Sequence, residues 1–337
     1  MELLFPVRSY EQALSYIQHG IKEFYCGYIH SEWISHFNKQ HETKTVTLQI
    51  SLNRRDYLTS NITDFEELKR LCELCKANSV KLFMTLNAAY YSESAYKFLD
   101  VWLSELDSAG IEHIIISDIG VMFYVKSHYP KFRITVSCEN QVINSMAVRF
   151  YKQFSPERIV FPRHITAKEM ESIILEYPEI MFESFLVSSR CIYDDGNCRC
   201  IHDIEPICSE AWITKFFSVD GHNQDYYENR LLKKAVQDMT DYIYGLEQSS
   251  YHGFGYGKTL CSICSVYNLC KHPNFVSLKV VGRGMRIPDR DIEYLKKVVY
   301  LSKSNKGIQD YMLLAQKMMD YDNLCQGHFN CCTRGEV

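Results

Sequence analysis

The sequence has no long apolar segment and no strong excess of one charge. No apolar run in the 337 residues approaches the roughly 20 that a membrane helix needs, so we expect no membrane span. The opening MELLFPVRSYEQ lacks a basic stretch followed by an apolar core, so we expect no signal peptide and a cytoplasmic protein. A net charge of −4 and a pI near 6.3 argue against binding to bulk nucleic acid or to an anionic membrane, because both favour a basic face.

Two common hydrolase motifs are also missing. The sequence contains neither the HExxH pattern that binds zinc in metalloproteases nor the GxSxG turn that carries a nucleophilic serine. A Cys–His pair can be assembled from several residues, Cys200 and His202 among them, but no spacing singles one out. The residues themselves therefore give little support to peptidase chemistry.

Cysteine, by contrast, is abundant. Fourteen cysteines in a reducing compartment indicate metal binding or redox chemistry rather than a disulfide framework. Cys191, Cys198 and Cys200 fall within ten residues, and the Asp-Asp-Gly sequence before Cys198 has the composition of a turn. Further cysteines follow at 208, 261, 264 and 270. Irregular spacing from loops distant in sequence favours an iron–sulfur cluster over a zinc ribbon, which uses two CxxC pairs. For Cys26, Cys72, Cys75 and Cys138, in expected strands or an amphipathic helix, we expect buried structural thiols.

Short apolar segments alternate with amphipathic helical patterns over the first 187 residues. Several of these segments are apolar on both faces, as strands buried in a parallel sheet must be. The expected strands are Leu3–Val7, Glu23–Tyr28, Thr45–Asn53, Lys81–Ala88, His113–Asp118, Arg133–Cys138, Arg158–Arg163 and Met181–Val187. The expected helices between them are Tyr10–His19, Asp64–Asn78, Ser92–Ala109, Val121–Ser127, Ser145–Phe154 and Ala167–Glu176. This alternation predicts a (β/α)₈ TIM-type barrel.

The pattern changes after residue 202. We predict a barrel over residues 1–202 and a cysteine-rich C-terminal region over 203–337, which contains an insertion or lid and closes the barrel mouth. Within that region we expect a helix at Tyr226–Leu246, a short strand at Val276–Val281 and helices at Asp289–Leu301 and Ile308–Met319.

Polar residues stand where the expected strands end, and a TIM barrel carries its chemistry at that end. The candidate anion-binding residues are Arg54 and Arg163, with Arg283 if its loop reaches the mouth. Asn87 and Asn144 offer amide groups for substrate binding, and Asp118 and Glu183 are candidate acid–base catalysts. For each of these residues, a structural ion pair or a strand-end cap is the alternative.

The stretch FESFLVSSRCIYDDGNC resembles the signature of peptidase family U32, the collagenase-like proteases. Matching positions are Glu183, Phe185, Ser189, Cys191, Gly196 and Cys198, whereas Ser188 replaces a glycine and Arg190 an aliphatic residue. Other stretches resemble the family too: LLFPVRSYEQALSYIQHGIKEFYCG at the start, SLNRRDYLTSNITDFEELK, and VSLKVVGRGMRIP, which places Arg283 at the family's arginine.

The resemblance implies a cofactor. Several U32 members are oxygen-independent hydroxylases that hold a [4Fe-4S] cluster on four cysteines and modify RNA bases or ubiquinone precursors, with prephenate implicated as oxygen donor. Cys191 and Cys198 match the first two ligands. Cys208 is the candidate for the third, with Cys200 as its substitute, and Cys264 or Cys261 for the fourth. Cys270, Cys325, Cys331 and Cys332 match no ligand of the family, so a second metal and a role without metal both stay open.

The resemblance therefore favours an iron–sulfur hydroxylase that acts on a small molecule or peptide, with an acidic co-substrate such as prephenate. The length is close to that of the ubiquinone-pathway members, which work in pairs, so a homodimeric or heterodimeric partner is also expected. The alternatives are a U32-type peptidase and a non-catalytic iron–sulfur partner subunit.

Overall fold

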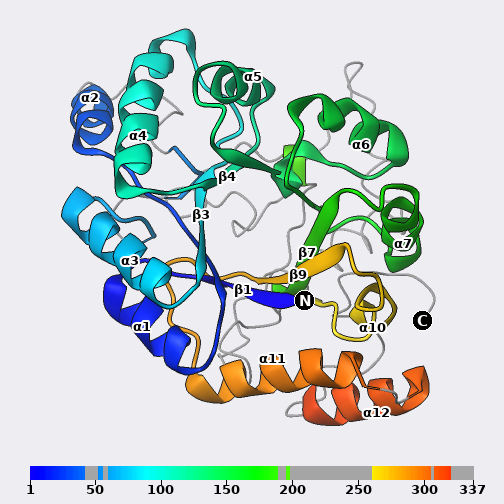
Figure 1. Ribbon diagram of the computed structural model, residues 1–337. Coiled ribbons are helices and arrows are strands. Elements are labelled where there is room, and N and C mark those ends of the chain that lie inside the picture. The colour runs from blue at the N-terminus through cyan, green and yellow to red at the C-terminus, as the bar shows by residue number, and fades with distance from the viewer. Residues whose placement is uncertain (42–51, 56–59, 189–194, 198–259, 305–306, 320–337) are drawn as a thin grey trace, which may run out of the picture.

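The chain forms a closed barrel of eight parallel strands with helices around it (Figure 1). The computed structural model describes residues 1–41, 52–55, 60–188, 195–197, 260–304 and 307–319. The barrel strands, in the order in which they pair around the ring, are β1 (Glu2–Pro6), β2 (Glu23–Cys26), β3 (Lys81–Leu86), β4 (His113–Ile116), β5 (Arg133–Val136), β6 (Arg158–Val160), β7 (Met181–Ser188) and β9 (Phe275–Val280). Pairing of β9 with both β7 and β1 closes the ring, which confirms the predicted TIM-type fold.

One predicted barrel strand is wrong, and another segment takes its place. The strands β2 and β3 pair directly, with Glu23 opposite Lys81, so the ring has no place between them for the strand that we predicted there. Residues 45–51 lie outside the described part, and Leu52 and Asn53 are not in a strand. The eighth strand is β9, which we expected only as a short strand of the C-terminal region. The segments on either side of residue 202 lie outside the described residues, so the division there stays a prediction.

The helices cover the outside of the barrel (Figure 1). Their bounds are α1 Tyr10–Gln18, α2 Ser31–His41, α3 Phe65–Ala77, α4 Tyr96–Ala109, α5 Ile119–His128, α6 Ser145–Tyr151, α7 Ala167–Glu176, α10 Val266–Leu269, α11 Asp289–Ser302 and α12 Ile308–Met319. Thr166 and Glu169 form a capping box at the start of α7, because each side chain accepts a hydrogen bond from the other residue's backbone N–H. Helix α2 was not predicted, and the predicted helix at Tyr226–Leu246 lies outside the described residues.

Alternate side chains of the strands enter two different cores. Outward side chains such as Ile114 and Ile116 of β4 join the large apolar layer between strands and helices. Inward side chains form a small cluster of Leu4, Tyr25, Phe83 and Ile115 in the barrel interior. Both faces of a strand are therefore buried, which explains the nearly continuous apolar runs in the sequence.

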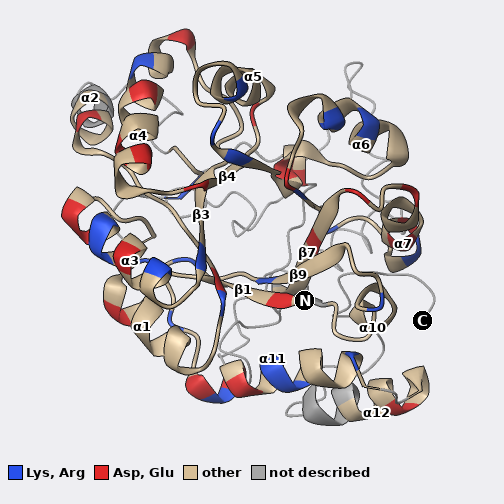
Figure 2. Ribbon diagram, viewed as in Figure 1, with Lys and Arg blue, Asp and Glu red and all other residues tan. Residues whose placement is uncertain are grey.

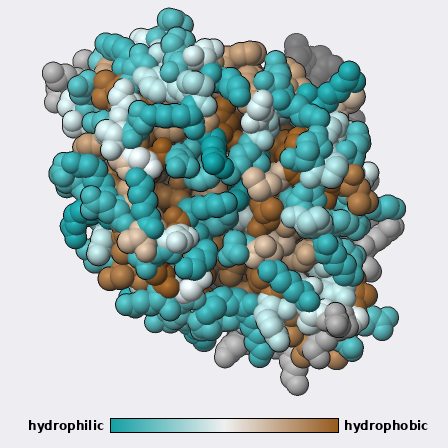
Figure 3. Space-filling view, in the orientation of Figure 1, coloured by the Kyte–Doolittle hydropathy of each residue, from teal (hydrophilic) through white to brown (hydrophobic). Residues whose placement is uncertain are grey.

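The outer surface carries charges of both signs. Lysine and arginine alternate with aspartate and glutamate on α3 and α11 (Figure 2), and hydrophilic side chains cover most of the same face (Figure 3). Within the described part of the chain, no helix is long and apolar enough to cross a membrane.

Candidate active site at the barrel mouth

The polar residues that follow the strands converge at the C-terminal end of the barrel. Arg54 comes from the segment between β2 and β3, and Glu139 from the short 3₁₀ helix η2 (Cys138–Asn140) after β5. Arg163 follows β6, and Asp195 begins the 3₁₀ helix η4 (Asp195–Asn197) after β7. These four side chains come from four different parts of the sequence, and the barrel brings them into contact.

Arg54 and Glu139 form an ion pair in which both side chains are almost fully buried. The same guanidinium donates to the carbonyl oxygen of Asp195 at 3.4 Å. Arg54 has a φ of 63°, a backbone conformation that residues other than glycine seldom adopt. Strained backbone of this kind is held in place by surrounding contacts and is common at functional sites. We predicted Arg54 as a substrate-binding residue; in the structure it contacts a carboxylate and a carbonyl of the protein.

Arg163 binds the Asp195 carboxylate through both its side chain and its backbone. Its guanidinium contacts Oδ1 of Asp195, and its backbone N–H donates to Oδ2 of the same carboxylate at 2.9 Å. The guanidinium also lies over the ring of Phe185 in β7, 3.9 Å from the centroid. The carboxylate that Arg163 binds is therefore one of the protein's own, in the segment between Cys191 and Cys198.

The third predicted arginine reaches the mouth as well. Arg283, in the loop after β9, is buried and donates to Oγ1 of Thr85 at 2.7 Å and to the carbonyl of Asn53 at 2.9 Å. Gly27, after β2, leaves the space for this arrangement. A Cβ at residue 27 would lie 1.9 Å from Oδ1 of Asn61 and 2.8 Å from the Arg283 guanidinium.

The other predicted polar residues have different positions. Asp118 caps α5 by accepting from the N–H of Val121 at 2.9 Å. Asn144 is exposed and caps α6 by accepting from the N–H of Ala147 at 2.9 Å. For both, the strand-end cap that we gave as the alternative is present. Asn87 differs, because its buried Oδ1 has no hydrogen-bond partner within the described residues.

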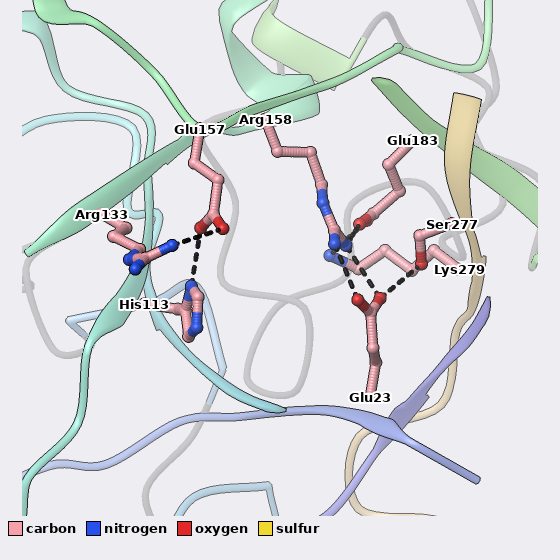
Figure 4. A network of polar contacts seen from close by, with 8 residues as sticks. All are labelled: Glu23, His113, Arg133, Glu157, Arg158, Glu183, Ser277 and Lys279. Atoms are coloured by element: carbon pink, nitrogen blue, oxygen red, sulfur yellow. Dashed lines mark hydrogen bonds and ion pairs between the residues drawn. The ribbon is translucent and has the colours of Figure 1, made fainter. Parts of the chain in front are cut away.

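Glu183 lies inside the barrel rather than at its mouth. Figure 4 shows its carboxylate next to Arg158, whose NH1 donates to it at 2.7 Å and whose other bonds go to Glu23. Nζ of Lys279 lies 3.6 Å from the second oxygen of Glu183. Glu183 is fully buried, and the structural ion pair that we gave as the alternative to acid–base catalysis is present.

Glu139, to which the strand-end rule of the barrel points but to which we assigned no role, is a carboxyl of the mouth with an unusual pKa. Burial raises the pKa to about 7, although the neighbouring Arg54 opposes the shift. Burial also lowers the pKa of Lys279, and the Glu183 carboxylate opposes that change. The signal for Glu139 in the sequence was its position directly after a strand, which it shared with several residues that turned out to be helix caps.

Oxygen and sulfur atoms of Cys138, Glu139 and Asp195 lie within 4.8 Å of one another. This spacing would suit a metal ion, but each of the two carboxylates already faces an arginine. Burial also raises the pKa of the Cys138 thiol well above its usual value, which disfavours the thiolate form. We therefore interpret this group as an ion-pair network.

The predicted cluster ligands are only partly within the described residues. Cys191, Cys198 and Cys208 lie outside them, as do Cys200, Cys325, Cys331 and Cys332. The short strand β8 (Leu260–Cys261) pairs antiparallel with the end of β7, so that Cys261 lies opposite Val187. Ser262 continues the pairing by donating to the carbonyl of Leu186, so the chain from Cys261 to Cys264 runs away from the strand end.

The remaining described cysteines belong to the scaffold. Cys26, Cys72, Cys75 and Cys138 are buried, as predicted for structural thiols. Burial raises the pKa of Cys270 to about 11. Burial lowers the pKa of the N-terminal amine of Met1, and the nearby Cys270 opposes that shift; Met1 precedes β1, at the opposite end of the barrel from the mouth.

Comparison of the sequence with known families shows which family the chain belongs to. The sequence profile of Peptidase family U32 matches residues 8–303. The chain belongs to this family.

U32 relatives include a tRNA hydroxylation protein P1 of Bacillus subtilis, 28% identical over 143 residues, which are 42% of this chain and 33% of that protein. A collagenase of Porphyromonas gingivalis is 26% identical over 208 residues, 58% of this chain and 44% of the collagenase. A tRNA hydroxylation protein P of Escherichia coli is 25% identical over 118 residues, 35% of this chain and 26% of that protein. The chain thus spans less than half the length of each of these U32 relatives.

Proposed function

We propose that this U32 protein is an iron–sulfur enzyme that hydroxylates a small molecule or a peptide without using molecular oxygen. Its cluster is held by Cys191, Cys198, Cys208 and either Cys261 or Cys264. Two relatives are named for tRNA hydroxylation, which supports a hydroxylase, although each aligns over less than half of this chain.

One observation supports the cluster position most strongly. The pairing of Val187 with Cys261 holds the fourth-ligand segment beside the end of β7, and Cys191 follows Val187 by only four residues. Chain geometry keeps Cys191 within about 14 Å of Val187, at roughly 3.5 Å for each residue. This supports a cluster whose thiolates come from two distant parts of the sequence and meet at one edge of the mouth.

A bound [4Fe-4S] cluster would supply electron transfer or a Lewis-acidic iron next to the substrate. The protein's own groups would do the rest. Glu139, with a pKa near 7, could donate or accept a proton at neutral pH. The side-chain oxygen Oδ1 of Asn87, which is buried, offers a hydrogen-bond acceptor to a substrate at the mouth. An acidic co-substrate such as prephenate would be attracted by the arginines gathered there.

Iron and sulfide quantification after anaerobic purification tests the cluster. We expect about four irons per chain and a broad absorption band near 400 nm in the wild type, and loss of most of both in Cys191→Ala. Stoichiometric zinc in place of iron would refute the proposal. Cys72→Ala, at a buried thiol of α3 in the apolar layer between helices and strands, is the matched control, because it removes a thiol without touching the mouth.

A second pair of variants decides between the two candidate fourth ligands. The register of β8 places Cys261 nearer than Cys264 to the end of β7, so we expect Cys261→Ser to lose iron and Cys264→Ser to retain it. The opposite result would assign Cys264.

The relative named as a collagenase keeps a peptidase as the alternative. A peptidase predicts peptide cleavage that persists after chelation of iron, whereas the hydroxylase predicts no cleavage. A non-catalytic partner subunit predicts that a complex with another protein survives substitution of Arg283, while a catalytic role at the mouth predicts loss of activity.

A further inference from the structure

We propose that Asp195 and Gly196 are positioning residues, which fix the segment between Cys191 and Cys198 against the barrel mouth and so determine where these two thiols are presented. The inference rests on the proposed function in one respect only, that the two thiols bind the cluster. The positioning itself concerns contacts that the protein makes without any cofactor.

The first support is the complete use of the Asp195 carboxylate. Its side chain is 3% exposed, and one oxygen contacts the Arg163 guanidinium while the other accepts the Arg163 backbone N–H at 2.9 Å. The backbone carbonyl of Asp195 accepts from Arg54 at 3.4 Å. A buried aspartate would be costly without such partners, and with them it attaches η4 to the residues after β6 and to the segment between β2 and β3.

The partners of Asp195 are themselves held in place. The Arg163 guanidinium lies over the ring of Phe185, and Arg54 is paired with Glu139. The chain of contacts therefore runs from β5 through Arg54 to Asp195 and from there to β6 and β7. Because η4 is attached in this way to three strands of a closed barrel, η4 has little freedom to shift.

The second support is independent of charge. Gly196 packs so closely on η2 that a Cβ would lie 2.5 Å from the carbonyl oxygen of Glu139 and 2.7 Å from Cγ of Gln141. The nearest atom is backbone, which cannot rotate away as the end of a side chain could. Glycine at this position lets η4 and η2 touch backbone to backbone, which gives a physical reason for the glycine between the two signature cysteines.

Because Cys191 and Cys198 are close to Asp195 in sequence, the position of η4 also restricts where these two thiols can lie. Cys198 follows Asp195 by three residues and Cys191 precedes it by four. Their Cα atoms therefore lie within about 11 Å and 14 Å of the Asp195 Cα, from the reach of an extended chain. The position of η4 thus limits both cysteines to the neighbourhood of the β5, β6 and β7 strand ends.

The experiment measures thiol exposure in the protein without cluster and iron retention in the protein with it. Asp195→Asn and Gly196→Ala are compared with the wild type and with Asp310→Asn, an exposed aspartate on α12, as control. The rate at which N-ethylmaleimide modifies Cys191 and Cys198 is followed by peptide mass spectrometry. We expect the modification rate to rise about tenfold in both site variants. Loss of one buried charged hydrogen bond shifts by about this factor the equilibrium between the closed segment and a segment opened to the reagent. We also expect faster loss of iron to a chelator.

A charge exchange separates positioning from general folding. Arg163→Asp combined with Asp195→Arg should bring the modification rate back toward that of the wild type, whereas each single change raises it. If Asp195→Asn fails to fold, Gly196→Ala still tests the inference, because it alters no charge.

The outcomes distinguish the two proposals. Wild-type rates and wild-type iron retention in both Asp195→Asn and Gly196→Ala would overturn the positioning inference and leave the cluster standing. Faster thiol modification in a protein whose wild type binds no iron would support the positioning and refute the proposed function.

Discussion

Arg54 and Glu139 form a buried ion pair across the barrel mouth, yet burial still raises the pKa of Glu139 to about 7. The pairing with Arg54 favours the charged carboxylate, and the loss of solvent disfavours it more strongly. Glu139 therefore changes its charge near neutral pH, where an ordinary glutamate is fully ionised.

Replacement of Glu139 by glutamine should change the pH dependence of stability. The folded state keeps a proton on Glu139 between the ordinary value of 4.5 and about 7, whereas the unfolded state releases it. As pH rises through that window, the free energy of unfolding of the wild type should therefore fall by about 3 kcal/mol, and that of the variant should not. Urea unfolding at several pH values between 4.5 and 8 measures the difference between the two proteins.

The contrast with an exposed glutamate provides the control for this pH experiment. Glu66→Gln, in the first turn of α3 at a side chain that is 71% exposed, removes a carboxylate far from the mouth and is measured in the same series. A wild type and a Glu139→Gln variant with parallel curves would show that Glu139 has an ordinary pKa.

Arg158→Met should destabilise the protein by about 3 to 5 kcal/mol, the usual effect of breaking a buried charge network on one side. The side chain is 1% exposed and hydrogen bonds to both Glu23 and Glu183 (Figure 4), so its removal leaves two carboxylates facing each other in the barrel. Arg133→Met, at a side chain that is 58% exposed, should cost no more than about 1 kcal/mol. Equal effects of the two substitutions on the free energy of unfolding would contradict the network's role.

Gly27→Ala should destabilise the protein by about 1 to 3 kcal/mol through overpacking at the mouth. The added methyl group would collide with Asn61, Asn53 and Arg283. At Gly307, where a Cβ would meet no atom within 4 Å, the same change should alter stability by less than about 0.5 kcal/mol. Thermal unfolding of both variants tests the prediction, which fails if Gly27→Ala is as stable as Gly307→Ala.

Tyr311→Phe should loosen the loop between Cys261 and Cys264. The Tyr311 hydroxyl on α12 donates to the carbonyl of Ile263 at 2.6 Å, and both groups are buried. We expect a loss of about 1 kcal/mol in the free energy of unfolding and faster exchange of the amide hydrogens in this loop. Tyr300→Phe, at a ring that is 74% exposed, should leave both measurements unchanged. An unaltered exchange rate in Tyr311→Phe would show that the loop does not depend on α12.

The sequence by itself determined the features that depend on neighbouring residues. The bounds Ala167–Glu176 of α7 followed from an N-cap at Thr166 and the spacing of the apolar residues, which are both local features. The alternation of strands and helices followed in the same way and predicted the barrel, and the motif around Cys191 and Cys198 indicated the family.

Tertiary structure alone decided which segments meet. Closure of the ring selected Phe275–Val280 in place of Thr45–Asn53 as the eighth strand, because a closing strand must pair with β1 and β7 at once, a condition that no local pattern expresses. It also decided which partners the arginines have. Arg163 follows β6 and Arg54 lies in the segment between β2 and β3, but only the folded barrel places Asp195 and Glu139 against them, because those carboxylates arrive from distant segments.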